Sequence, residues 1–178
     1  MTYKWSVISV IALCLSGCAA SGKPYSGLAQ SSVASPTSGR LTVFRTAETK
    51  IAAGRDTLIA VDSTATKYVG YGGYVSFDIG AGDHIINASM PGDKTQCTLQ
   101  LSLGPRDELF FEVKPLTERI MTEAFSAGLT AGLLTKGIYV GDTRAPGSIK
   151  PCEGYFSITA VERDYALNKL VTIRESSQ

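Results

Sequence analysis

His84 is the only histidine of the chain and the only side chain whose ordinary pKa lies near neutral pH, so it is the first candidate for acid–base chemistry. A hydrolytic triad would need a nucleophile and a carboxylate gathered around it. The sequence contains no G-x-S-x-G elbow, no phosphate-cradling glycine loop and no metal-spaced pair of His and Glu. Since His84 directly follows the turn Gly80–Asp83, we expect a structural or exposed histidine. We predict that the protein is not an enzyme and uses no cofactor or metal; a hydrolase acting through His84 is the alternative.

The adjacent carboxylates Asp107 and Glu108 are the next candidates for acid–base chemistry. Neighbouring residues of a strand point to opposite faces, so these two side chains are poorly placed for a shared task. We expect them to keep a turn soluble.

Three tyrosines, Tyr68, Tyr71 and Tyr74, alternate with glycines between residues 68 and 74. Exposed aromatic rings over a backbone thinned by glycine could stack on a sugar or hold a partner's strand. The alternative is that the rings cover glycines across a bent hairpin. The three tyrosines are the best sequence-based candidates for partner binding.

The N-terminus has the features of a secretory signal. Met1–Lys4 carries one positive charge, and Trp5–Leu15 is an apolar run too short to span a membrane. The run leads into Leu-Ser-Gly followed by Cys18, an order that resembles the lipobox of bacterial lipoproteins. The resemblance implies cleavage before Cys18 and acylation of its thiol with palmitate-type chains. Because Ala19 rather than an acidic residue follows, it also implies sorting to the outer membrane of a Gram-negative cell, facing the periplasm.

The two cysteines that lie beyond the signal and the lipobox are expected to pair. Cys14 leaves with the signal and Cys18 is acylated, which leaves Cys97 and Cys152 in an oxidising compartment. We predict a disulfide between them, closing a loop of about 55 residues and adding at most about 4 kcal/mol to the free energy of unfolding. A two-cysteine metal site is the alternative, but no second histidine exists to complete it.

Composition limits the partners and the number of domains. The signal contains one basic residue, Lys4, so the mature chain has equal numbers of basic and acidic side chains. This balance argues against a nucleic-acid surface. Residues 18–39 are rich in Ser, Ala, Gly and Pro and predict a flexible tether whose ends lie about 25 Å apart. Residues 40–178 suffice for one domain.

Short runs of β-forming residues, separated by turn signals, follow the tether. Polar and apolar residues alternate between residues 98 and 103, which indicates a strand with one solvated face. The fold predicted is a mainly β, small antiparallel sandwich, with strands at Arg40–Arg45, Thr57–Asp62, Tyr74–Ile79, Ile85–Met90, Gln96–Leu103, Leu109–Lys114 and Tyr155–Val161.

Two helices are predicted among these strands, one before the last strand and one after it. Leu116–Thr135 places its apolar residues on one helical face and predicts an amphipathic helix inserted before the last strands. It packs on the sheet or touches lipid; the sequence leaves both open. Glu162–Leu170 predicts a short C-terminal helix.

The segments Gly39–Arg45, Ile59–Asp62, Gly72–Phe77 and Gly80–Ile86 resemble an uncharacterised family of small Gram-negative lipoproteins carrying a domain of unknown function. That domain is similar to PEGA-type and carboxypeptidase-regulatory-type β-sandwiches. In the family's pattern an Asp-Gly turn follows the second strand, whereas Ser63 follows Asp62 here. The resemblance implies a sandwich and no catalytic or ligand residue.

These observations favour a membrane-anchored, periplasm-facing lipoprotein that acts as a non-enzymatic interaction or structural module for an envelope protein or polymer. The alternatives are a component of a secretion or surface apparatus, like the transthyretin-like lipoprotein of the type VI membrane complex, and a periplasmic inhibitor or immunity lipoprotein.

Overall fold

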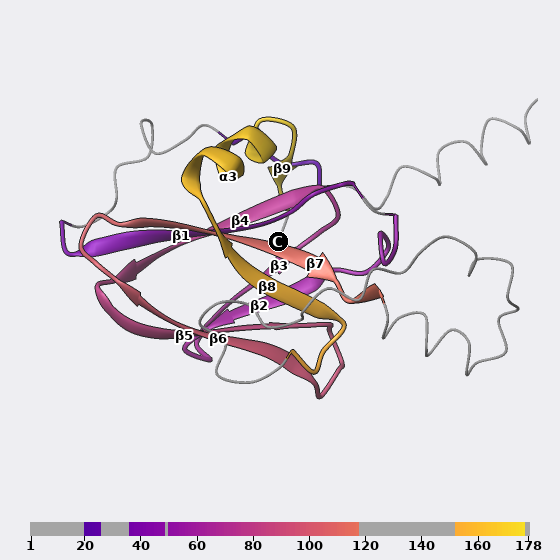
Figure 1. The fold of residues 1–178 in the computed structure, drawn as a ribbon, viewed down its shortest axis with the longest axis horizontal. Coiled ribbons are helices and arrows are strands. Elements are labelled where there is room, and N and C mark those ends of the chain that lie inside the picture. The colour runs from indigo at the N-terminus through magenta and orange to yellow at the C-terminus, as the bar shows by residue number, and fades with distance from the viewer. Residues whose placement is uncertain (1–19, 26–35, 49, 118–151, 177–178) are drawn as a thin grey trace, which may run out of the picture.

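The computed structural model describes residues 20–25, 36–48, 50–117 and 152–176. They form two packed sheets and one helix (Figure 1), which confirms the predicted β-sandwich with its short C-terminal helix. The helix predicted over Leu116–Thr135 falls almost wholly on residues outside this description.

Nine strands and the helix α3 follow one another along the described chain. Their bounds are β1 Ser38–Arg45, β2 Thr57–Val61, β3 Ala65–Val69, β4 Gly73–Gly80, β5 Gly82–Ser89, β6 Gln96–Leu103, β7 Glu108–Pro115, β8 Phe156–Val161, α3 Arg163–Leu170 and β9 Arg174–Glu175. The sequence predicted all but β3 and β9, with ends that differ by up to three residues.

One sheet has the order β8-β7-β1-β4-β9 and the other has the order β3-β2-β5-β6. The second is antiparallel throughout, as predicted. The first is mixed, because β1 runs parallel to β7 and β4 runs parallel to β9. The predicted antiparallel pairing therefore holds for the second sheet and for the other pairs of the first, and the two parallel pairings depart from it. Such pairings join segments distant in sequence and leave no local signal.

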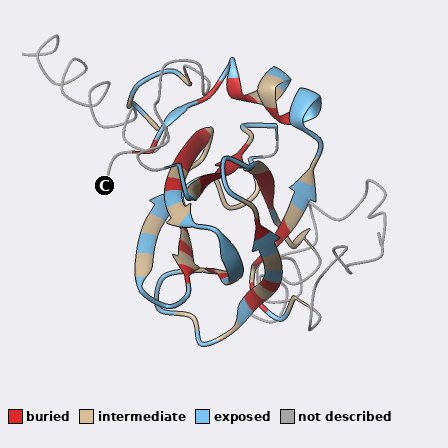
Figure 2. Cartoon of the chain, turned by 90° about the vertical axis from the view of Figure 1, so that its left-hand side faces the viewer, coloured by how far each residue is buried: buried red, intermediate tan, exposed pale blue. Residues whose placement is uncertain are grey.

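The main core lies between the sheets. Alternate residues of every long strand point into it, including Leu41, Val75 and Ile86, and the alternation shows as banded colouring along the strands in Figure 2. A second, smaller core lies on the outer face of the mixed sheet, where Phe44 and Phe110 pack against Leu170 of α3. The central strand β1 is therefore buried on both faces.

Helix α3 covers only part of that outer face. Asp164 in its first turn and Lys169 in its last turn complement the helix dipole. The chain then turns and adds the short strand β9 beside β4. The rest of the outer face carries polar side chains instead of helix.

The hairpin from β2 to β3 turns through Asp62 and Ser63, which have φ values of 50° and 59°. The amide of Thr64 donates to the carbonyl of Val61 at 3.0 Å, so residues 61–64 form a β-turn whose two central residues have positive φ. Ser63 therefore takes the conformation that a glycine would adopt more easily.

Candidate functional site

Cys97 and Cys152 form a disulfide in the structure, with 4.1 Å between their Cα atoms. Cys97 is buried in β6, and Cys152 lies shortly before β8. The bond therefore fastens the entry into β8 to the opposite sheet. The predicted lipidation site Cys18 lies outside the described residues.

The three predicted partner-binding tyrosines do not share one surface. Tyr68 on the edge strand β3 is 44% exposed, whereas Tyr74 on β4 is buried and belongs to the core under α3. Tyr71 is partly buried, and its hydroxyl donates to the carbonyl of Ala47 at 2.6 Å. The prediction is corrected for Tyr74, because a second apolar layer outside the sheet was not evident from the sequence.

The glycines among these tyrosines leave room for residues from both ends of the described chain to pack against the backbone. A Cβ at Gly73 would lie 2.3 Å from Oγ of Ser176 and 2.9 Å from Cβ of Ala20. Gly72 has a φ of +66°, which favours glycine. A side chain at residue 73 would therefore clash with residues from both ends of the described chain.

His84 is held by two hydrogen-bond acceptors. Its Nδ1 lies 2.7 Å from the Asp62 carboxylate and its Nε2 lies 2.8 Å from the carbonyl of Gly80. The hydrogen bond to Asp62 raises the pKa of His84, and the backbone contact to Gly80 adds to this. The same bond lowers the pKa of Asp62, whose other oxygen accepts the amide of Ile85. The sequence singled out His84 as a candidate but did not reveal its carboxylate partner, Asp62, which lies 22 residues earlier in the chain.

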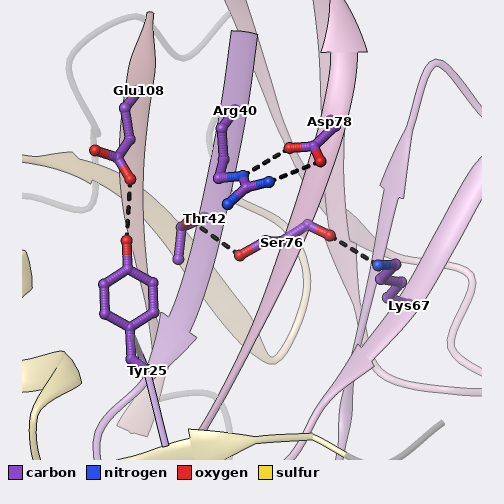
Figure 3. A network of polar contacts seen from close by, with 7 residues as sticks. All are labelled: Tyr25, Arg40, Thr42, Lys67, Ser76, Asp78 and Glu108. Carbon is purple, nitrogen blue, oxygen red and sulfur yellow. Dashed lines mark hydrogen bonds and ion pairs between the residues drawn. The ribbon is translucent and has the colours of Figure 1, made fainter. Parts of the chain in front are cut away.

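A row of polar pairs crosses the outer face of the mixed sheet (Figure 3). Arg40 on β1 donates from Nε and Nη2 to both carboxylate oxygens of Asp78 on β4, at 2.6 and 2.7 Å. Two register positions along, on the same face, the hydroxyls of Thr42 and Ser76 lie 3.1 Å apart. Lys67 reaches over from β3 and donates to the Ser76 carbonyl at 2.7 Å. Each group is matched inside the protein, so the row fixes the pairing of β1 with β4 and links the two sheets.

Two carboxylates of β7 are nearly inaccessible, with side chains 2% exposed. Glu108 accepts the hydroxyl of Tyr25 at 3.0 Å and forms an ion pair with Arg163 of α3. Burial and the neighbouring Glu108 raise the pKa of Tyr25. The prediction that Glu108 merely keeps a turn soluble is wrong: it fastens the N-terminal segment and α3 to the sheet.

Glu112 is the second of these carboxylates. Its Oε2 accepts the hydroxyl of Tyr165 at 3.0 Å and pairs with Lys114 at the same distance. Its Oε1 is buried with no hydrogen-bond partner among the described residues. Like Glu108, Glu112 therefore links α3 to β7, but only one of its two carboxylate oxygens is hydrogen-bonded within the described residues.

Residues 20–25 lie along the edge of the mixed sheet, whereas the sequence predicted a flexible tether there. The amide of Ala20 donates to the carbonyl of Tyr71 at 3.3 Å, and that of Gly22 donates to Glu175 at 3.0 Å. In return the amide of Glu175 donates to Lys23 at 2.8 Å. In Figure 1 this indigo segment lies beside β9. A Ser- and Gly-rich composition conceals such backbone pairing, because the bonds do not depend on side chains.

A cleft of about 370 Å³ opens at the end of the sandwich where Ala20 is bound. Its walls come from the chain after β1, the turn before β4 and the chain after α3. Glu48 and Lys169 form an ion pair at this cleft, which raises the pKa of Lys169 and lowers that of Glu48. Arg174 also contributes to the wall, so the cleft carries two cations and one carboxylate.

Within the described ranges, no group of three or more His, Cys, Asp or Glu side chains could hold a metal ion. No helix of the described part is long and apolar enough to cross a membrane. Neither a protein-family model nor a curated protein matches the sequence.

Proposed function

We propose that this protein is a lipoprotein, anchored through Cys18 to the outer membrane on its periplasmic side, whose sandwich is a non-enzymatic interaction module. One observation carries the proposal: a positive charge, an apolar run, small residues and a cysteine stand in that order at the N-terminus. Several acyl chains on one residue would make the anchor effectively permanent, since each buried methylene contributes about 0.8 kcal/mol.

The internal pairing of the polar side chains supports the non-enzymatic part of the proposal. His84 uses both ring nitrogens in hydrogen bonds, and Arg40 and Asp78 neutralise one another. Glu108 is enclosed by Tyr25 and Arg163. These groups are used in contacts within the sandwich and stabilise it.

The outer edge of β3 is the best candidate for partner contact. β3 is an end strand of its sheet and carries Tyr68, one of the few exposed large hydrophobic residues. An edge strand offers unpaired backbone groups to an added strand, and tyrosine adds contact area at low entropic cost. The partner would be an envelope protein or polymer.

Anchoring is tested by replacing the two N-terminal cysteines separately. Cys18→Ser should abolish incorporation of a clickable palmitate analogue and release the protein from the membrane fraction. Cys14→Ser is the matched control and should keep both label and location, because residue 14 lies in the segment that is removed. Palmitate incorporation into Cys18→Ser would refute the proposed anchor.

The partner-binding role is tested with a photo-crosslinking amino acid placed at Tyr68 in cells. Tyr165, which is 38% exposed on α3, is the control position. A dominant adduct from residue 68 that is absent from residue 165 supports contact through β3. Equal background from both positions contradicts it.

A further inference from the structure

The anchor residue must lie close to one end of the sandwich. Cys18 stands two residues before Ala20, whose amide is bonded to the carbonyl of Tyr71. A residue spans at most about 3.6 Å of extended chain, so two residues reach at most about 7 Å. Acyl chains on Cys18 would therefore enter the bilayer beside Tyr71, without the spacing that a free tether of residues 18–39 would give.

The surface at this end suits a phospholipid headgroup layer. Val171 is 74% exposed and directly precedes residues that line the same cleft as Ala20. In the cleft wall Lys169 pairs with Glu48, and Arg174 adds a second cation, so the wall carries one net positive charge. Tyr71 adds an amphipathic ring, a residue type enriched at membrane interfaces. Cations near an apolar tip match the anionic phosphates above the acyl region.

We propose that the end of the sandwich formed by Tyr71, Lys169, Val171 and Arg174 rests on the headgroup layer of the membrane that holds the lipid of Cys18. The inference depends on the lipidation proposed above. It fixes the orientation of the domain: β4 leads from Gly73 at the membrane to Gly80 at the far end, about 23 Å away at the usual rise of a strand. A partner must then meet the domain close to the membrane surface.

The orientation is tested on the full lipidated protein in vesicles of phosphatidylethanolamine and phosphatidylglycerol. A single bimane label is attached to Val171→Cys, or to Ala81→Cys in the exposed turn after Gly80 at the far end. Labelling is specific because Cys97 and Cys152 are bonded to one another and Cys18 is acylated. Lipids brominated near the headgroup end of their chains should quench the label at residue 171 and leave the label at residue 81 unchanged.

A second pair of variants tests whether the bound N-terminal segment sets this orientation. A Cβ at Gly22 would lie 2.3 Å from the backbone oxygen of Glu175, so Gly22→Val must displace the segment. Ser21→Val is the control, since residue 21 is exposed. Gly22→Val should lose the quenching at residue 171 while the protein still floats with the vesicles, and Ser21→Val should keep it.

The outcomes separate this inference from the proposed function. Equal quenching at residues 171 and 81, or none at 171, in protein that carries lipid on Cys18 and floats with vesicles would overturn the orientation and leave the anchor intact. Protein that carries no lipid and does not float would refute the proposed function and the orientation together.

Discussion

The carboxylate of Asp62 lies 2.7 Å from Nδ1 of His84 and joins the end of β2 to β5. Its second oxygen accepts the amide of Ile85 at 2.9 Å. Because the carbonyl of Gly80 can only accept, both ring nitrogens of His84 donate when the ring is protonated. Asp62 and Asp83 both favour that charged form.

The contact between Asp62 and His84 predicts that the free energy of unfolding falls at alkaline pH. The pKa of His84 is raised in the folded protein. Its contribution to the free energy of unfolding is therefore complete below the ordinary pKa of 6.5 and is lost as pH rises through the raised pKa. The pKa of Asp62 is lowered, so its contribution is present above its ordinary 3.8 and is lost as pH falls through the lowered value. Since Asp62 is largely solvent-exposed, we expect a loss of at most about 1 kcal/mol in unfolding free energy from pH 6 to 9.

Denaturant unfolding across that range checks the prediction. Asp62→Asn is the matched variant, because asparagine tolerates the positive φ of this position. It should remove most of the pH dependence and move the NMR-measured pKa of His84 back toward 6.5. An unchanged His84 pKa in that variant would show that the carboxylate is not responsible.

Ser63→Gly should stabilise the protein. Ser63 has a φ of 59° in a turn that glycine fits without strain, so we expect a gain of about 0.5 to 1 kcal/mol in unfolding free energy. Thr64→Gly is the control and should lower stability, because no positive φ is relieved there. Thermal unfolding of the two variants measures both signs, and a destabilised Ser63→Gly would contradict the turn geometry.

Arg45 should be among the most sensitive positions of the fold. Its side chain is buried at the end of the main core and donates to the carbonyls of Arg55 at 2.5 Å and Ala52 at 2.7 Å. Its guanidinium also lies 4.9 Å from the centre of the Phe156 ring. Arg45→Met keeps most of the volume but leaves the carbonyls unpaired, which should cost about 3 kcal/mol. Arg55→Met, at an exposed position, should cost little in the same denaturant titration.

Tyr25 and Tyr165 offer a matched comparison of two tyrosine-to-carboxylate hydrogen bonds. Each hydroxyl donates to a glutamate of β7 at 3.0 Å. Tyr25→Phe should cost about 1 to 2 kcal/mol, because it removes a donor from the enclosed Glu108 and loosens the N-terminal segment. Tyr25 donates to Oε1 of Glu108, whereas Arg163 pairs with the other oxygen, so Tyr25→Phe leaves Oε1 without this donor. Tyr165→Phe should cost less, because the oxygen of Glu112 that accepts Tyr165 also pairs with Lys114. Amide exchange at Gly22 should accelerate only in Tyr25→Phe; unchanged exchange there would contradict the role of Tyr25 in holding the segment.

Local patterns in the sequence were enough to predict most strands. Leu99 and Leu103 face the core while Gln100 and Ser102 face solvent, as their alternation predicts. The strand β3 was missed because it has little buried apolar surface and follows a turn without glycine. For β9, two exposed residues gave no pattern at all.

Features set by distant contacts could not be predicted from local patterns. The parallel pairing of β1 with β7, the partnership of Asp62 with His84 and the binding of residues 20–25 join segments far apart in the chain. The burial of Tyr74 depends on α3, which lies about 90 residues later. The pairing of Cys97 with Cys152 was predictable because these are the two cysteines outside the expected signal and the proposed anchor.

The mass of the N-terminal peptide of the protein purified from its native envelope shows whether Cys18 is the lipidated first residue. The proposed anchor predicts a peptide that begins at Cys18 and carries a diacylglyceryl group with an additional amide-linked acyl chain. A mature N-terminus at any other residue, or an unmodified Cys18, would contradict it.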